Sequence, residues 1–313
     1  MYYIAHRLFA AHDRALAAQL AHELALKIGE DQIFLPFCDT AEEDLVADVK
    51  GKRVFELDCD RLPRLRALIA IMHGPSVDDG VCMEIGYAAA LHVPIVVMTT
   101  DFQDYSTAPA SQHTPFPDPL LDAVATQILR TPRLGPVPGT AGSTRFAAFA
   151  ARNQLQIHHA VRACTEAILH LPTSATGVHE SPARADDTVY VEPSPYAAAE
   201  DNLLTDLTAH GIRADGPTRF NHPDAASAAR ADWLRASTAP RIVIDVCGAE
   251  TPPGAALLIG AACATGRPVA AYLPRATYTH AAGREPNHRN LMVQYGLTAT
   301  FTCTGEAAAW LRQ

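Results

Sequence analysis

The sequence of 313 residues lacks features that would place it in several large classes of protein. It has no basic excess, since 25 Lys and Arg stand against 34 Asp and Glu, for a formal net charge of −9. Nucleic-acid binding rests on a basic surface, so nucleic acid is not expected as the main partner. No apolar run approaches the ~20 residues of a membrane-spanning helix, and the amino terminus lacks the apolar core of a signal peptide. We therefore expect a cytoplasmic protein that does not bind membranes.

Cysteine patterns typical of metal sites and disulfide frameworks are missing as well. The seven cysteines are an odd number, and none forms a CxxC pair. Most of them sit in apolar runs, where cysteine packs as a small core residue. This usage indicates a reducing compartment and no structural metal. A glycine-rich phosphate loop of the P-loop type is also missing.

What the sequence does contain is an alternation of strand-like and helix-like runs. Apolar runs typical of buried strands alternate with helical patterns over the first 100 residues and again near the carboxyl terminus. This order predicts an α/β fold with parallel sheets, in which ligands bind outside the carboxyl ends of the strands. The expected strands are Tyr2–Ala5, Gln32–Pro36, Leu68–Met72, Pro94–Thr99 and Val189–Val191, and the expected helices include Asp13–Lys27, Gly80–Leu91 and Thr144–Leu171.

Length and composition predict two domains. The chain is longer than one typical domain of ~100–150 residues. The segment 172–187, PTSATGVHESPARADD, has the composition of a linker. We therefore expect a domain at 1–171, called the first half below, and a second half at 188–313.

The two halves share a repeat. When Leu68–Val97 is shifted by 174 residues, so that Leu68 falls on Ile242, the two segments align without a gap. Three glycines and a proline then coincide: Gly74 with Gly248, Gly80 with Gly254, Gly86 with Gly260, and Pro94 with Pro268. The alternative is a chance likeness between two generic α/β segments. The second copy has Pro252, Pro253 and Leu258 where the first has Asp78, Asp79 and Glu84. This pattern is typical of a duplicated domain that has lost its catalytic carboxylates.

Three carboxylates of the first half are candidate catalytic groups. Glu84 stands in an otherwise uncharged helical run, where a charge is costly unless it is hydrogen-bonded or used. The alternatives are a glutamate on the exposed side of the helix and an acid at the helix start that the macrodipole stabilises. Asp78 is either a second catalytic acid or a helix cap. Asp58 is either a third catalytic acid or a solvated charge on a helix. Two carboxylates near an anomeric carbon suit a double displacement, in which one attacks and the other protonates the leaving group.

These residues and their neighbours resemble the motifs of a known family. The opening Tyr3-Ile-Ala, the strand end Ile33-Phe-Leu-Pro, Phe55-Glu-Leu-Asp58 and above all Asp78-Asp-Gly-Val-Cys-Met-Glu84-Ile-Gly-Tyr-Ala resemble the nucleoside 2-deoxyribosyltransferases. The resemblance covers about residues 1–105 and recurs weakly over 188–313. It implies two flavodoxin-like (Rossmann-like) α/β domains with parallel sheets, related by duplication and packed face to face.

The resemblance also implies the roles of individual residues. Glu84 would attack C1′ of the deoxyribose, Asp78 would move the proton of the base, and Tyr3 would hold the Glu84 carboxylate. Family sites are completed by a neighbouring subunit through an Asn-Leu-Met-like segment, and only the second half has one, at Asn290–Met292. We therefore expect an internal pseudo-dimer in which Asn290 and Met292 reach the Glu84 site. The alternative is that Asn290 only caps a docking helix. The remaining candidate substrate-binding residues are Asp58, Gly80, Phe37, His6 and Arg7.

The reaction expected from the resemblance is base exchange on 2′-deoxynucleosides, with a nucleoside and a free nucleobase as partners and no cofactor. His6 and Arg7 depart from the family pattern, and so does Phe37 at the base-contact position. A phosphate contact at His6 or Arg7 would instead favour a hydrolase of nucleosides or nucleoside 5′-monophosphates with the same nucleophile. The residues are also compatible with a non-catalytic nucleoside or nucleotide sensor, and with a subunit of a larger assembly, including a homo-oligomer.

Overall fold

The computed structural model describes residues 1–39, 50–106, 113–136, 144–171, 187–195, 202–248, 250–274 and 290–313. Within them lie two parallel five-stranded sheets, one in each half. The strands of the first sheet are β1 (Tyr2–Ala5), β2 (Ile33–Phe34), β3 (Ala67–Ile71), β4 (Ile95–Thr99) and β7 (Gln127–Arg130). Those of the second are β8 (Val189–Glu192), β9 (Ala214–Asp215), β10 (Ile242–Asp245), β11 (Val269–Tyr272) and β12 (Ala299–Phe301).

The two sheets have the same strand order. The first is ordered β2-β1-β3-β4-β7, and the second, read from the matching edge, is β9-β8-β10-β11-β12. This is the 2-1-3-4-5 order of flavodoxin-like folds, as expected from the sequence. The register agrees too, because Tyr3 is paired with Leu68 and Tyr190 with Ile242, the residue onto which Leu68 falls in the repeat. A short antiparallel pair, β5 (Tyr105–Ser106) and β6 (His113–Thr114), lies outside both sheets.

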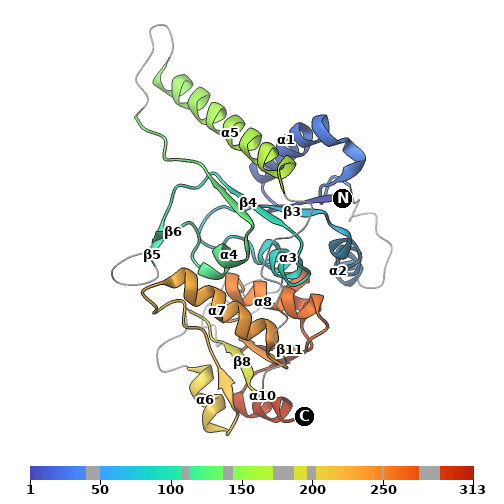
Figure 1. The fold of residues 1–313 in the computed structure, drawn as a ribbon, viewed down its shortest axis with the longest axis vertical. Helices are drawn as coiled ribbons and strands as arrows, with labels where there is room; N and C mark the ends of the chain where they lie inside the picture. Colours follow the sequence, from blue (N-terminus) through green and yellow to red (C-terminus); the bar gives the residue numbers. More distant parts are fainter. Residues whose placement is uncertain are drawn as a thin grey trace, which may run out of the picture.

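The helices form layers on both faces of each sheet (Figure 1). Helices α1 (Ala11–Ile28) and α5 (Arg145–Leu169) cover the outer face of the first sheet, and α6 (Leu203–Ala209) and α10 (Thr304–Leu311) cover that of the second. Six helices fill the space between the sheets: α2 (Lys50–Arg61), α3 (Asp79–Ala90), α4 (Pro119–Val124), α7 (Ala225–Thr238), α8 (Pro253–Ala264) and α9 (Leu291–Gly296). Within the described residues, the short 3₁₀ helices η1 (Glu30–Gln32) and η3 (Leu62–Arg64) precede β2 and β3.

The two halves meet at a close crossing of α3 and α8. A Cβ on Gly86 would lie 1.8 Å from the carbonyl oxygen of Leu257, and one on Gly260 would lie 1.9 Å from that of Met83. Only glycine allows backbones to approach this closely. The contacts are reciprocal, because the repeat places Met83 on Leu257 and Gly86 on Gly260. Such an exchange of equivalent contacts is the mark of a two-fold interface.

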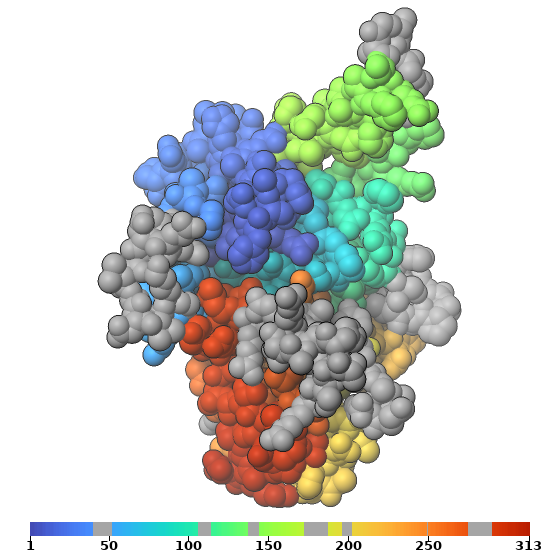
Figure 2. Space-filling view, turned by 180° about the vertical axis from the view of Figure 1, so that it is seen from behind, coloured from blue at the N-terminus to red at the C-terminus, as the bar shows by residue number. Residues whose placement is uncertain are grey.

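One continuous hydrophobic core runs across this crossing. It includes buried residues of both halves, among them Tyr3, Ile85, Leu257 and Ile259. In the space-filling view the orange and red part of the second half lies directly against the blue and cyan part of the first half (Figure 2). The halves therefore pack face to face, as the sequence predicts.

Most of the predicted elements agree with the structure to within one or two residues. The strand expected over Gln32–Pro36 is shorter, because Asp39 accepts a hydrogen bond from the backbone N–H of Leu35 and closes a turn directly after β2. The predicted linker, apart from Asp187, lies outside the described residues. Among the described helices, none combines the length and apolar character needed to cross a bilayer.

Candidate active site

Glu84 is buried and held by Tyr3. All residues from Asp79 to Ala88 of α3 are buried, so the helix has no solvent-facing side at Glu84. The Glu84 side chain is accordingly 8% exposed, which excludes the alternative of an exposed helix glutamate. The Tyr3 hydroxyl, from β1, donates a hydrogen bond of 2.5 Å to Oε1 of Glu84. The distance is that of a charge-assisted O–H···O⁻ bond.

Burial and neighbouring charge perturb this carboxyl. Desolvation raises the pKa of Glu84 well above its usual value, and the negative charges of Asp58 and Asp78 raise it further. The hydrogen bond from Tyr3 acts in the opposite direction, because it stabilises the carboxylate. A buried carboxyl with strongly perturbed pKa beside other acids is typical of a functional site.

Asp78 lies in a strained loop between β3 and α3. Val77 and Asp78 have φ angles of 47° and 56°, a region that a β-branched residue rarely adopts. Asp78 caps α3, since its Oδ1 accepts from the backbone N–H of Val81 at 3.0 Å. Burial raises its pKa, while the bond from Val81 and the charge of Arg7 lower it. Asp78 is therefore a helix cap, one of the two alternatives that the sequence left open, and its Oδ2 faces Arg7 Nε at 4.0 Å.

Asp58 reaches the same cluster from α2. Its charge raises the pKa of both Glu84 and Tyr3. Arg61, three residues further along the helix, lies 3.5 Å from Asp58 Oδ1. The Arg61 guanidinium also stacks on Phe34, 4.2 Å from the ring centroid, and that ring lies 5.2 Å from the ring of Tyr3. Arg61 is absent from the candidates chosen from the sequence, although its spacing from Asp58 on one helix face could have indicated it.

Asn290 of the second half lies beside the first turn of α3. A Cβ on Gly80 would lie 2.7 Å from Asn290 Nδ2, so this amide packs directly against the glycine. Gly80 and Glu84 are one helical turn apart on the same face of α3. Asn290 also caps α9, accepting from the backbone N–H of Met292 at 2.9 Å. The sequence posed a helix cap and a contribution to the Glu84 site as alternatives; the structure shows the cap, with the amide beside Gly80.

Asp79 links Asn290 to α3, a role that the sequence did not reveal. It bonds the Asn290 side chain and accepts from the backbone N–H of Thr251 at 3.4 Å. Burial, followed by the charge of Asp78, raises its pKa to about 6. The motif alone does not reveal this role of Asp79, because its partners lie 172 and more residues away in sequence.

The remaining candidates from the sequence, Met292, Arg7, His6 and Phe37, lie in different surroundings. Met292 is buried in the core shared by the two halves, where its backbone N–H orients Asn290. Arg7 faces Asp78, whereas the buried His6 ring bonds the carbonyl of Ile4 and burial lowers its pKa. Phe37 is 46% exposed, has a φ of 65°, and lies under the guanidinium of Arg14.

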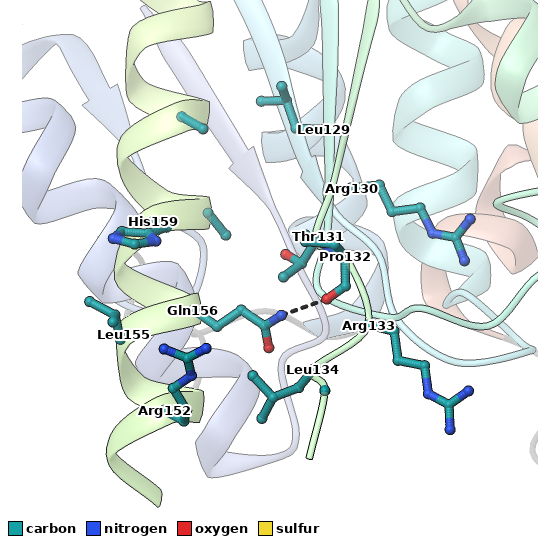
Figure 3. A pocket seen from close by; sticks show the side chains of 13 residues that line it. Leu129, Arg130, Thr131, Pro132, Arg133, Leu134, Arg152, Leu155, Gln156 and His159 are labelled. Atoms are coloured by element: carbon teal, nitrogen blue, oxygen red, sulfur yellow. Dashed lines mark hydrogen bonds between the residues drawn. The ribbon is translucent and has the colours of Figure 1, made fainter. Parts of the chain in front are cut away.

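A separate pocket of about 480 Å³ lies between the chain that follows β7 and helix α5 (Figure 3). Its lining includes Arg130, Arg133, Arg152 and His159 but none of the residues around Glu84. Arg130 is already engaged by Asp104 and two backbone carbonyls, and Gln156 donates to the carbonyl of Pro132 across the pocket. No group of His, Cys, Asp and Glu side chains suited to a metal ion occurs within the described ranges.

Comparison with protein families places the chain in a known family. A family model described as nucleoside 2-deoxyribosyltransferase matches residues 2–192, more than half of the chain. Comparison with curated proteins gives no significant match.

Two solved structures are also similar in part. A conserved protein from Enterococcus faecalis V583 is 28% identical, over 32% of this chain and 63% of that one, with a TM-score of 0.28. A UDP-GlcNAc 2-epimerase from Neisseria meningitidis bound to UDP-GlcNAc is 11% identical, over 100% of this chain and 89% of that one, with a TM-score of 0.26. The chain therefore spans less than two thirds of the Enterococcus protein. Both TM-scores are too low to carry an argument.

Proposed function

Because the chain belongs to the nucleoside 2-deoxyribosyltransferase family, we propose that it exchanges the base of 2′-deoxynucleosides through a covalent glycosyl-Glu84 intermediate. The observation that carries this proposal is the buried Glu84 carboxyl held at 2.5 Å by the Tyr3 hydroxyl. A carboxylate that is desolvated and fixed in one orientation is well suited to attack a sugar carbon. The charges of Asp58 and Asp78 also act on this carboxyl.

In the first step the Glu84 carboxylate forms a bond to C1′ of the deoxyribose. The N-glycosidic bond breaks, and its electron pair stays on the ring nitrogen of the leaving base. Asp78 supplies the proton for that base, a role supported by the upward shift that burial gives to its pKa. Tyr3 keeps Glu84 oriented and, by stabilising the carboxylate, opposes the effect of burial on its charge.

In the second step the ring nitrogen of another base attacks C1′, and the bond from C1′ to Glu84 breaks. Asp78 takes back the proton that the incoming base loses. The enzyme is then restored with no net gain or loss of protons. Water as acceptor would give hydrolysis by the same route.

The second half contributes Asn290 to this site. Its amide lies beside Gly80, one turn before Glu84, where it can hold a hydroxyl group of the sugar. The common strand order, the gap-free repeat and the reciprocal contacts of Gly86 and Gly260 support an origin by duplication. In this pseudo-dimer one half provides the nucleophile and the other completes its surroundings.

A nucleoside 5′-monophosphate hydrolase is the second candidate function, and one observation favours it. Arg7 follows β1, faces the Asp78 loop and is partly exposed, so it could contact a phosphate. Against this, Glu250 adds negative charge to the same region, since it raises the pKa of both Asp78 and Asp79. The charge balance therefore favours an uncharged nucleoside.

Chromatography of a reaction with one 2′-deoxynucleoside and a different free base tests the proposal. We expect a new deoxynucleoside with the wild-type protein and none with Glu84→Gln. Free base without a new nucleoside would mean hydrolysis, and repeating the assay with 5′-monophosphates would test the role of Arg7. If no base is released from any substrate while a nucleoside still raises the melting temperature, the protein is a binding protein and the proposed reaction is wrong.

A further inference from the structure

Arg219 is a fully buried guanidinium that joins the two halves. It is 0% exposed and lies in the loop after β9. Its Nε and Nη2 donate to the two carboxylate oxygens of Asp118 in the first half, each at 2.7 Å. Nη2 also donates to Glu192 at 2.6 Å, and Nη1 lies 3.4 Å from Asp232. Such a two-pronged bond between Arg and a carboxylate fixes orientation as well as charge.

This cluster stands at the place in the second half that corresponds to the Glu84 site. Gly254 is the repeat partner of Gly80, and a Cβ on it would lie 2.1 Å from Asp118 Oδ2 and 2.6 Å from Arg219 Nη2. Asp118 caps α4 by accepting from the N–H two residues further on, as Asn290 does for α9. Asp118 is thus the first half's counterpart of Asn290, although the sequence suggested that this half has none.

Other parts of the corresponding site are retained. The pair Asp58 and Arg61 falls, after the shift of 174 residues, on Asp232 and Arg235, which also form an ion pair. Tyr190 holds the place of Tyr3 beside the central strand. Its buried hydroxyl has no hydrogen-bond partner within the described part of the chain, because Leu258 stands where Glu84 would be.

The two cap residues lie on opposite flanks of the α3–α8 crossing. On one flank Asn290 of the second half reaches Gly80, and on the other Asp118 of the first half reaches Gly254. The halves meet through one packed core, in which α8 contacts both α4, the helix that Asp118 caps, and α9, the helix that Asn290 caps. A rigid contact at the Asp118 flank therefore also sets the position of Asn290.

We propose that Arg219 fills the second half's counterpart of the Glu84 site and, through Asp118, fixes the position of one half relative to the other. Arg219 is then a positioning residue for Asn290. The filled counterpart leaves one productive site in each chain. The catalytic part of this proposal rests on the proposed role of Glu84, whereas the mechanical part does not.

Hydrogen–deuterium exchange of the full chain tests the mechanical part without any activity. We expect Arg219→Ala to speed exchange at least tenfold in the peptide covering α9, where the Met292 N–H bonds Asn290. Arg241→Ala, which removes an arginine of the same half bonded to Trp310, is the control and should leave α9 unchanged. Faster exchange confined to the loop of Arg219 and to α4 would overturn the proposal.

Guanidinium at low millimolar concentration provides a matched rescue. Arg219→Ala leaves a cavity lined by three carboxylates that this ion fits, so we expect it to slow exchange in α9 again. Sodium at equal ionic strength should not. Removing one partner of a buried ion pair is strongly destabilising, so the variant should melt about 10 °C lower. If it does not fold, Asp118→Asn, which removes one charge and keeps an oxygen for the α4 cap, serves for the exchange measurement.

A double-mutant cycle tests the link to the active site. Arg219→Ala should reduce kcat/KM about 10- to 100-fold in the wild-type background, as expected for a displacement of about 1 Å. It should cost nothing further in Asn290→Ala, because it acts through that amide. Equal losses in both backgrounds would contradict the positioning role. If the wild-type protein has no glycosyl-transfer activity, the proposed function fails. The exchange and rescue results still test whether Arg219 fixes the position of one half relative to the other.

Discussion

The hydrogen bond between Tyr3 and Glu84 can be tested quantitatively, because Tyr190 in the second half provides a matched control. Replacing Tyr3 by Phe removes a donor at 2.5 Å from a buried carboxylate. A hydrogen bond to a charged group contributes ~1.5–3 kcal/mol. That free energy stabilises the charged form of Glu84, so its loss raises the pKa of Glu84 further.

The consequence appears in the pH profile of the reaction. Attack on C1′ needs the carboxylate, so kcat/KM falls as the pH drops through the pKa of Glu84. A loss of ~1.5–3 kcal/mol moves this acidic limb upward by roughly one to two pH units. We therefore expect Tyr3→Phe to be about 10- to 100-fold less active at acidic and neutral pH, and to recover part of this loss at alkaline pH.

Tyr190→Phe is the matched control, because the Tyr190 hydroxyl has no partner among the described residues. Removing a buried, unpaired hydroxyl relieves a desolvation cost of ~1–3 kcal/mol. We expect unchanged kinetics and a melting temperature that is equal to or higher than that of the wild type. Measuring kcat/KM from pH 5 to 9 for the three proteins checks the reasoning. An acidic limb that stays in place in Tyr3→Phe would refute it.

Four more variants test separate parts of the structure. Glu84→Gln should lower transfer by at least ~10³-fold and prevent mass labelling by a nucleoside that traps the glycosyl-enzyme, whereas the wild type should gain one sugar per chain. Asn290→Ala should reduce kcat/KM about 10- to 100-fold in steady-state assays; wild-type kinetics would mean that the second half does not complete the site. Gly86→Ala, whose Cβ would lie 1.8 Å from the Leu257 carbonyl oxygen, should lower the melting temperature by several degrees or prevent folding, while Gly305→Ala, which meets nothing within 4 Å, should not. Burial, then the charge of Asp118, raises the pKa of Asp122 to about 7. The protonated carboxyl therefore favours the folded state at acid pH, and this contribution is lost as the pH rises through 7. Asp122→Asn should raise the melting temperature at pH 8 and not at pH 4, and an equal effect at both pH values would contradict the raised pKa.

Much of the architecture could be predicted from short-range patterns. Strands and helices depend on hydrophobic periodicity, and Gly74, Gly80, Gly86 and Pro94 marked the repeat without any coordinates. Glu84 could also be identified from the sequence, because burying a charge in an apolar helix costs free energy whichever residue stabilises it. The shorter β2 could not be predicted, since it ends at the bond between Asp39 and Leu35.

The contacts that make the site depend on the tertiary structure. Tyr3 meets Glu84 across 81 residues, Asp79 meets Thr251 across 172, and Arg219 meets Asp118 across 101. None of these pairs is implied by local spacing, because parallel sheets bring together segments from distant parts of the chain. The sequence established the fold class, the repeat and the candidate nucleophile. Only the packing of two similar halves about α3 and α8 decided that one flank holds Asn290 beside Gly80, while the other is closed by a buried arginine.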